Sequence, residues 1–143
     1  MPETQRSETG AAELRAPVEL RVAAELTQLP VLRAMAETIT LLNEFNLDEI
    51  SDVKLAVDQI CSELIGDAVD GAELVCRFQL GGKVLWVAIS TSTRTAEAPD
   101  RQGFGWHVLR TLTDSIAVDR EPLDTSTAGY RTTVELTKVK GGA

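Results

Sequence analysis

A chain of 143 residues is long enough for one domain with its own core, and 43% hydrophobic with 25% charged residues is ordinary for a soluble globular protein. The formal net charge of −8, from 22 acidic against 14 basic residues, makes nucleic acid an unsuitable direct ligand, because phosphate binding needs clustered cations. A basic protein partner would instead be attracted to this surface.

The N-terminal part of the chain divides into a tail, a strand and a helix. Residues 1–16 are polar and weakly patterned, which predicts a flexible tail before a single domain over residues 17–140. Apolar and polar residues then alternate after Pro17, which indicates a half-buried strand near a sheet edge. A helix is expected to open at Thr27 or Gln28, with Pro30 in its first turn, and to run to residues 43–46.

The longest periodic segment is Asn46–Val69, where apolar residues recur at spacings of three and four. This pattern predicts a long amphipathic helix, with a capping box between Asn46 and Glu49 at its start and Gly71 as its stop. Beside the apolar stripe, Gln59 and Glu63 project from one face, with Asp67 a turn further on. Such a polar row either lines a site or is an ordinary solvated flank.

Two strand-like runs follow, Ala72–Leu80 and Lys83–Ser90, and Gly81-Gly82 between them predicts a tight hairpin. Residues 91–103 contain no large apolar group and are expected to form a long loop. Gly103 and Gly105 then lie at or just before a helix start, where backbone N–H groups can receive an anion, although this spacing is also common in loops that bind nothing.

The last third is expected to contain that helix, a short strand from Ile116 to Val118, a loop over Arg120–Gly129 and a final strand from Tyr130 onward. The predicted order β-α-α-β-β-α-β-β indicates an α+β two-layer sandwich. Trp86 and Trp106 are predicted to be core residues.

The two cysteines, Cys61 and Cys76, have neither CxxC nor Cys/His spacing, so buried free thiols are expected. No apolar run approaches membrane-spanning length, and the N-terminus lacks a hydrophobic signal core. We therefore expect a cytoplasmic protein that does not contact a membrane.

Three segments occur in the order of known motifs: Leu55–Ile65, Gly103–Val118 and Gly129–Thr137. Together they resemble the anti-sigma factor kinases of the RsbW type, in the GHKL group of histidine-kinase-like ATPases. The resemblance covers about residues 18–138 and is nearest to actinobacterial anti-sigma factors of stress or sporulation sigma factors. It implies a GHKL (Bergerat) two-layer α/β sandwich, with a mixed, mostly antiparallel sheet and the helices on one face.

In that family the first motif supplies a glutamate as general base and, one turn later, an asparagine that holds Mg²⁺ on the nucleotide phosphates. The matching positions here are Gln59 and Glu63. Gln59 has no titratable group and cannot accept a proton from an attacking serine, which removes a contribution of about 10²–10⁴ in rate. Glu63 has oxygens suited to Mg²⁺ but brings negative charge toward a triphosphate, and Asp67 adds to it.

The family's second motif is an aspartate followed by a glycine two residues on, and it binds the adenine amino group. Thr91 and Thr93 stand at those positions, so the charge-assisted contact is absent. The resemblance matches Gly103 and Gly105 to the glycine-rich phosphate motif. The family's late-strand threonines, which line the pocket, have candidates here in Thr132 and Thr133.

Two functions stay open. The first is an anti-sigma factor that sequesters an alternative sigma factor, is released by an anti-anti-sigma antagonist with a STAS domain, and binds ATP and Mg²⁺ weakly at a degenerate site. The second is an active serine/threonine kinase that uses Mg·ATP to phosphorylate that antagonist. Loss of the base and of the adenine aspartate favours the first. The resemblance also implies a homodimer, formed through the exposed sheet edge or the first helix.

Overall fold

The computed structural model describes residues 16–94, 104–122 and 129–141. It confirms the predicted element order, with a short 3-10 turn added before the first helix. Of the predicted tail, only residue 16 lies within the described residues. The elements are β1 (Val18–Ala23), η2 (Leu26–Gln28), α2 (Leu29–Leu42), α3 (Leu47–Gly66), β2 (Glu73–Gly81), β3 (Val84–Thr93), α4 (Phe104–Leu112), β4 (Ser115–Pro122) and β5 (Tyr130–Val139).

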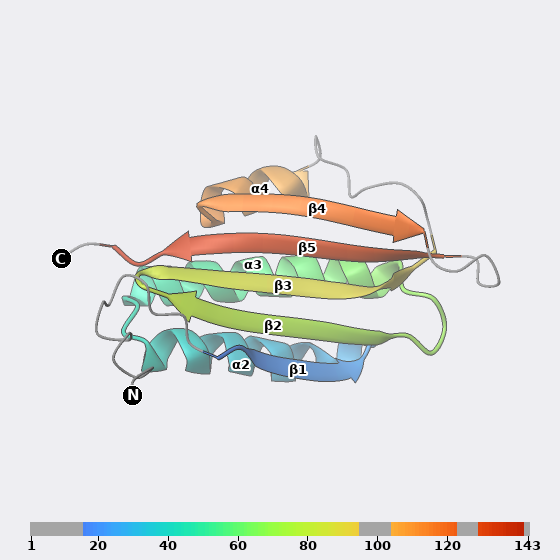
Figure 1. Ribbon diagram of the computed structural model, residues 1–143, viewed down its shortest axis with the longest axis horizontal. Coiled ribbons are helices and arrows are strands. Elements are labelled where there is room, and N and C mark those ends of the chain that lie inside the picture. The colour runs from blue at the N-terminus through green and yellow to red at the C-terminus, as the bar shows by residue number, and fades with distance from the viewer. Residues whose placement is uncertain (1–15, 95–103, 123–128, 142–143) are drawn as a thin grey trace, which may run out of the picture.

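The five strands form one sheet in the order β1-β2-β3-β5-β4, and the helices lie on one of its faces (Figure 1). This confirms the two-layer α+β sandwich. All four strand pairs are antiparallel, so the described strands contain no parallel pair such as a mixed sheet would have. The other face of the sheet, called the open face below, is not covered by any described helix.

The core lies between α3 and the centre of the sheet. The apolar stripe of α3 is buried as its spacing predicts. Alternate residues of β2, β3 and β5 are buried on the helix-facing side of the sheet and pack against this stripe. Each large apolar side chain buried in this way contributes about 1.5–3 kcal/mol. The best-buried members of the sheet side are Leu74, Cys76, Phe78, Leu85, Val87, Ile89 and Leu136.

The start of α3 is fixed by the predicted capping box. The Asn46 side chain accepts from the Glu49 backbone N–H and the Glu49 carboxylate accepts from that of Asn46, both at 2.8 Å. The second Glu49 oxygen accepts from the backbone N–H of Gly141 at 2.6 Å. One buried carboxylate therefore ties the helix start to the chain just after β5.

The end of α3 differs from the prediction. The helix ends at Gly66 rather than near Val69, because the next residues pair with the end of β3 instead. Val69 donates its backbone N–H to Ser92 at 2.9 Å, and Arg94 donates to the Asp67 carbonyl at 2.9 Å. Gly71 serves the following turn, where its φ of 78° lies in the region that favours glycine.

Three further expectations change. β3 continues to Thr93, so its last residues are strand rather than loop, and the rest of that predicted loop lies outside the described residues apart from Arg94. β4 extends to Pro122, so it takes in the first part of the predicted loop that began at Arg120. Trp106 is buried as expected, but Trp86 is 41% exposed on the open face, so the core prediction for Trp86 is wrong.

Both thiols are buried and free, as predicted. Burial raises the pKa of the Cys61 thiol to about 12, with a smaller contribution from the nearby Asp58 carboxylate, and burial also raises the pKa of Cys76 well above its ordinary value. Within the described residues, no helix is both long and apolar enough to cross a membrane.

Candidate functional site

The polar row predicted on α3 faces the N-terminal end of α4. Gln59 donates from its side-chain amide to the Glu63 carboxylate at 2.7 Å, as the four-residue spacing allows. Gly105 of α4 packs directly on this pair. A Cβ placed on Gly105 would lie 2.8 Å from Gln59 Nε2 and 2.9 Å from Glu63 Oε2, so only glycine fits here without displacing the two side chains.

A small cavity adjoins Glu63 on the inner side of α4. This cavity of about 10 Å³ lies between α3, α4 and β5, which is about the volume that one water molecule needs. Trp106 and Leu109 of α4 form one wall, and Val134 of β5 lies opposite. The apolar face of α4 therefore seals the layer between the helices and the sheet, while the Gln59–Glu63 pair stays at its outer rim.

A cluster of buried hydroxyls lies further along the same face of the sheet. The hydroxyl oxygens of Thr93 and Thr132 are 2.8 Å apart on neighbouring strands. Thr91 is also buried, and its hydroxyl donates to the Glu73 carbonyl at 2.8 Å. These three predicted residues are thus brought together, and each hydroxyl already has a partner within the protein.

Two of the predicted residues do not join this cluster. Thr133 follows Thr132 in β5, and because successive strand residues face opposite ways it lies on the open face, in register with Ser90 and Asp119. Asp67 caps the end of α3 rather than extending the polar row by another turn. Gly103 lies outside the described residues.

Arg120 is a residue at this end of the sheet that the sequence reasoning missed. It pairs in register with Thr132, so its half-buried side chain is on the helix-facing side beside the hydroxyl cluster. The prediction had placed Arg120 in a loop. The signal that would have found it is the continued alternation of Ile116, Val118 and Arg120, which extends the short predicted strand.

The arrangement bears on two kinds of chemistry. The Gln59 amide is a hydrogen-bond donor and acceptor without a titratable proton, so it positions groups but does not act as a general base near neutral pH. For a metal, no group of three or more histidine, cysteine, aspartate or glutamate side chains is arranged as a ligand set in the part of the chain that the structure describes.

Comparison with known proteins gives a consistent result, although no protein-family model matches. The curated protein "Anti-sigma-F factor RsbW" from Mycobacterium tuberculosis, strains CDC 1551 / Oshkosh and ATCC 25618 / H37Rv, is 31% identical over 112 residues, which cover 78% of this chain and 67% of that protein. The crystal structure of the RsbU and RsbW domains of Rv1364c from M. tuberculosis superposes with a TM-score of 0.65 at 16% identity, over 90% of this chain and 34% of that one.

The antiparallel five-stranded sheet, its one-sided helix layer and this structural similarity define a domain of the GHKL type. The resemblance noted in the sequence is thereby confirmed at the level of fold. The identity to the curated relatives is high enough, over enough of both chains, to settle the family. This chain belongs to the RsbW anti-sigma factor family.

Proposed function

We propose that the protein is an anti-sigma factor that binds an alternative sigma factor by surface contacts and needs no phosphoryl transfer to do so. Family membership supports the sigma factor as partner, since the curated relatives are anti-sigma-F factors. The net charge of −8 favours a partner with a basic contact surface.

The observation that carries this proposal is the Gln59–Glu63 hydrogen bond beneath Gly105. A kinase that phosphorylates a serine needs a base near the hydroxyl, and glutamine supplies none. The amide is also engaged with its neighbour, which holds both side chains against α4. The position where the family places its catalytic pair is therefore a structural contact between two helices in this chain.

The same residues are a poor fit for Mg·ATP. Glu63 offers a full negative charge where the family has a neutral asparagine, and opposing a triphosphate with a carboxylate costs binding energy. The hydroxyls of Thr93 and Thr132 are hydrogen-bonded to each other, and neither supplies the charge-assisted contact that an aspartate would make with adenine. We therefore propose that nucleotide binds weakly and that binding of the sigma factor is independent of it.

Release is proposed to occur by competition. An anti-anti-sigma antagonist, of the STAS-domain class that the family resemblance implies, would occupy the anti-sigma factor and free the sigma factor without being phosphorylated. We propose the cytoplasm as the location, since that is where a sigma factor would be met.

The test is co-purification of the full chain with the sigma factors of its host, with and without Mg·ATP. We expect one alternative sigma factor to bind equally in both conditions, and complex formation that strictly required nucleotide would contradict the proposal. A parallel assay with radiolabelled ATP and the cognate antagonist separates the kinase alternative. Label transfer at a rate comparable to a relative with an intact glutamate and asparagine would establish the kinase instead.

A further inference from the structure

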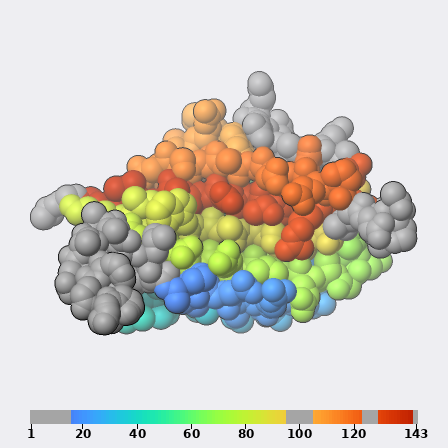
Figure 2. Space-filling model, in the orientation of Figure 1, coloured from blue at the N-terminus to red at the C-terminus, as the bar shows by residue number. Residues whose placement is uncertain are grey.

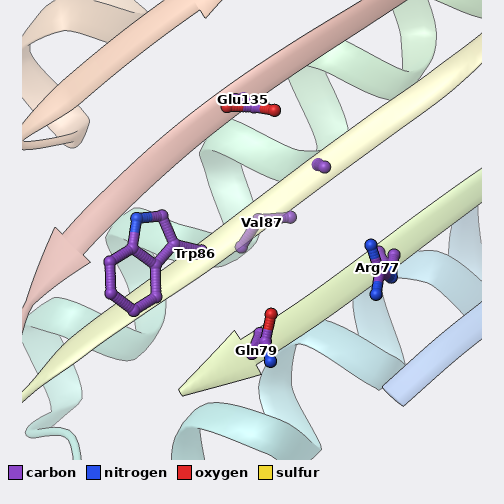
Figure 3. Close-up of a pocket in the computed structure, with 6 residues that line it drawn as sticks. Arg77, Gln79, Trp86, Val87 and Glu135 are labelled. Atoms are coloured by element: carbon purple, nitrogen blue, oxygen red, sulfur yellow. The ribbon is translucent and has the colours of Figure 1, made fainter. Parts of the chain in front are cut away.

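The two layers of the protein expose large apolar side chains in different settings. On the open face, which Figure 2 shows, Trp86 adjoins a hollow of about 340 Å³ whose lining includes Arg77, Gln79 and Glu135. Figure 3 shows these polar side chains on both sides of β3, so the indole ring lies among charges. The helix layer instead exposes a group of leucines that are close together in the sequence.

These residues, called the leucine patch below, lie where α2 ends, where α3 begins and on the outer side of α3. Each is between 55% and 81% exposed: Leu41, Leu42, Leu47 and Leu55. None of them belongs to the buried core of the two helices, which consists of residues such as Leu32, Val53 and Val57. A leucine that stays exposed adds little to the stability of the fold, whereas removing its side chain from water against a partner is favourable.

Two ion pairs fix how α2 and α3 lie against each other. Arg33 pairs with Asp58 at 2.7 Å and Glu37 pairs with Lys54 at 3.2 Å, so residue numbers rise along one helix as they fall along the other. The two helices are therefore antiparallel neighbours. Continuing this register by four residues in α2 places Leu41 beside the first turn of α3, so the parts of the leucine patch on the two helices adjoin each other.

The part of the leucine patch on α3 forms a stripe. Leu47, Ser51 and Leu55 follow one another at four-residue spacing and are all exposed, so they line one side of the helix. This stripe begins beside Leu41. The apolar face of an amphipathic helix presents residues at the same three- and four-residue spacings, so a single helix of a partner fits this surface.

The charges beside the leucine patch favour a basic partner. Glu44, in the turn between the helices, and Asp48, in the first turn of α3, are exposed and form no ion pair with any described residue. Lys140 reaches this turn, but its ammonium group donates to the backbone carbonyl of Asn43 at 2.8 Å. The two carboxylates are therefore left to attract cations of another molecule.

The conformation of Glu44 adds to this argument. Its φ of 64° lies in the left-handed region, at the position after a helix end where glycine is usual. Glu44 and Phe45 donate their backbone N–H groups to the carbonyls of Leu41 and Thr40, both at 3.1 Å, which is the pattern of a Schellman motif. A carboxylate close to a helix C-terminus is also unfavourable for the helix dipole. Contacts within the chain therefore do not explain a glutamate here, whereas a cationic partner does.

We propose that the leucine patch is the surface that binds the sigma factor, and that it receives an amphipathic helix with an apolar stripe over Leu41, Leu47 and Leu55. Both free carboxylates lie at the end of the leucine patch formed by the α2–α3 turn, so the basic residues of the bound helix lie at that end. The inference rests on the proposed function for the identity of the partner, and on the leucine patch for the place and chemistry of the contact.

The first test measures the affinity of the full chain for the sigma factor that co-purifies with it, by isothermal titration calorimetry. Leu41→Ala combined with Leu47→Ala should weaken binding about tenfold or more, because two apolar contacts are lost. The matched control is Leu26→Ala, which makes the same truncation at a 60% exposed leucine of η2, before the start of α2, and should leave the affinity unchanged. Urea denaturation of each variant checks that the fold is retained.

A second variant separates binding from folding. Glu44→Gly should raise the melting temperature, because glycine adopts the left-handed conformation without strain, and yet weaken sigma-factor binding about threefold. A residue that acts only through the fold would not weaken binding when the fold becomes more stable. Binding by Glu44→Gly that is as tight as that of the unchanged chain would contradict the role of the carboxylate and overturn the proposed basic contact.

The remaining outcomes distinguish this inference from the proposed function. If no sigma factor binds the unchanged chain, the proposed function fails and the inference fails with it. If the sigma factor binds and the double leucine variant binds as tightly as Leu26→Ala, only the assignment of the surface fails. Sedimentation equilibrium tests a second copy as the occupant, since a change in oligomeric mass at unchanged sigma-factor affinity would also overturn the assignment.

Discussion

Replacing Glu63 with asparagine tests whether the charge at this position limits nucleotide binding. Glu63 is the residue that the sequence resemblance matches to the family's magnesium ligand; it is solvent-exposed, and its carboxylate accepts a hydrogen bond from Gln59 at 2.7 Å. Two like charges about 4 Å apart repel by about 4 kcal/mol at an effective dielectric of 20 and by about 1 kcal/mol in bulk water. Because Glu63 is exposed, the lower part of that range applies.

Removing this repulsion should make the binding free energy of Mg·ATP about 1–2 kcal/mol more favourable, so Glu63→Asn should bind Mg·ATP roughly tenfold more tightly. Asparagine still accepts a hydrogen bond from Gln59, so the free energy of unfolding should change by less than about 1 kcal/mol. Isothermal titration calorimetry with Mg·ATP measures the affinity, and urea denaturation measures the stability.

The matched control is Asp48→Asn, which removes the same charge from the first turn of α3. Asp48 and Glu63 are separated by about 22 Å along the helix, beyond the Debye length of about 8 Å at physiological salt. The control should leave nucleotide affinity unchanged. If Glu63→Asn binds no tighter than Asp48→Asn, or if the unmodified protein already binds in the low micromolar range, the charge at residue 63 is not the limiting feature.

Three other predictions concern stability and reactivity. Glu49→Ala should lower the free energy of unfolding by about 2–3 kcal/mol in urea, because two backbone N–H groups lose their acceptor, whereas Asp48→Ala should cost less than about 1 kcal/mol. Gly66→Ala should raise it by about 0.5–1 kcal/mol, since no atom lies within 4 Å of the added Cβ, and a lower melting temperature would contradict this. Burial raises the pKa of Cys61 from 9.0 to about 12 and also raises that of Cys76. The thiols of the unfolded chain therefore ionise at lower pH than those of the native protein, so the free energy of unfolding should fall as pH rises above 9. Rapid thiol labelling of the native protein at pH 8 would contradict the burial of both thiols.

The helix layer is the part of the fold that sequence patterns predict best. Its signals are local: the capping box needs only Asn46 and Glu49, and the buried stripe of α3 needs only its own spacing. The end of α3 is decided by tertiary contacts instead. Val69 leaves the helix because Ser92, far along the chain, offers its backbone a strand-like hydrogen bond, and no local pattern contains that information.

The candidate site was only partly predictable for a similar reason. The four-residue spacing of Gln59 and Glu63 fixes their shared face, but their contact with Gly105 depends on how α4 packs. Alternation along β5 already separates Thr132 from Thr133, which therefore belong to different faces. Arg120 was missed because a single charged residue at the end of a short apolar run reads equally well as strand or loop.

The error over Trp86 has a specific physical cause. β3 is apolar on both faces, so alternation alone does not tell whether Trp86 or its neighbours Leu85 and Val87 point toward the core. The register of β3 with β2 determines which of them is buried. A core position was predicted for Trp86 because this large apolar residue lies within a strand-like apolar run. This prediction fails because the register with β2 turns Trp86 to the open face, where no described helix covers the ring.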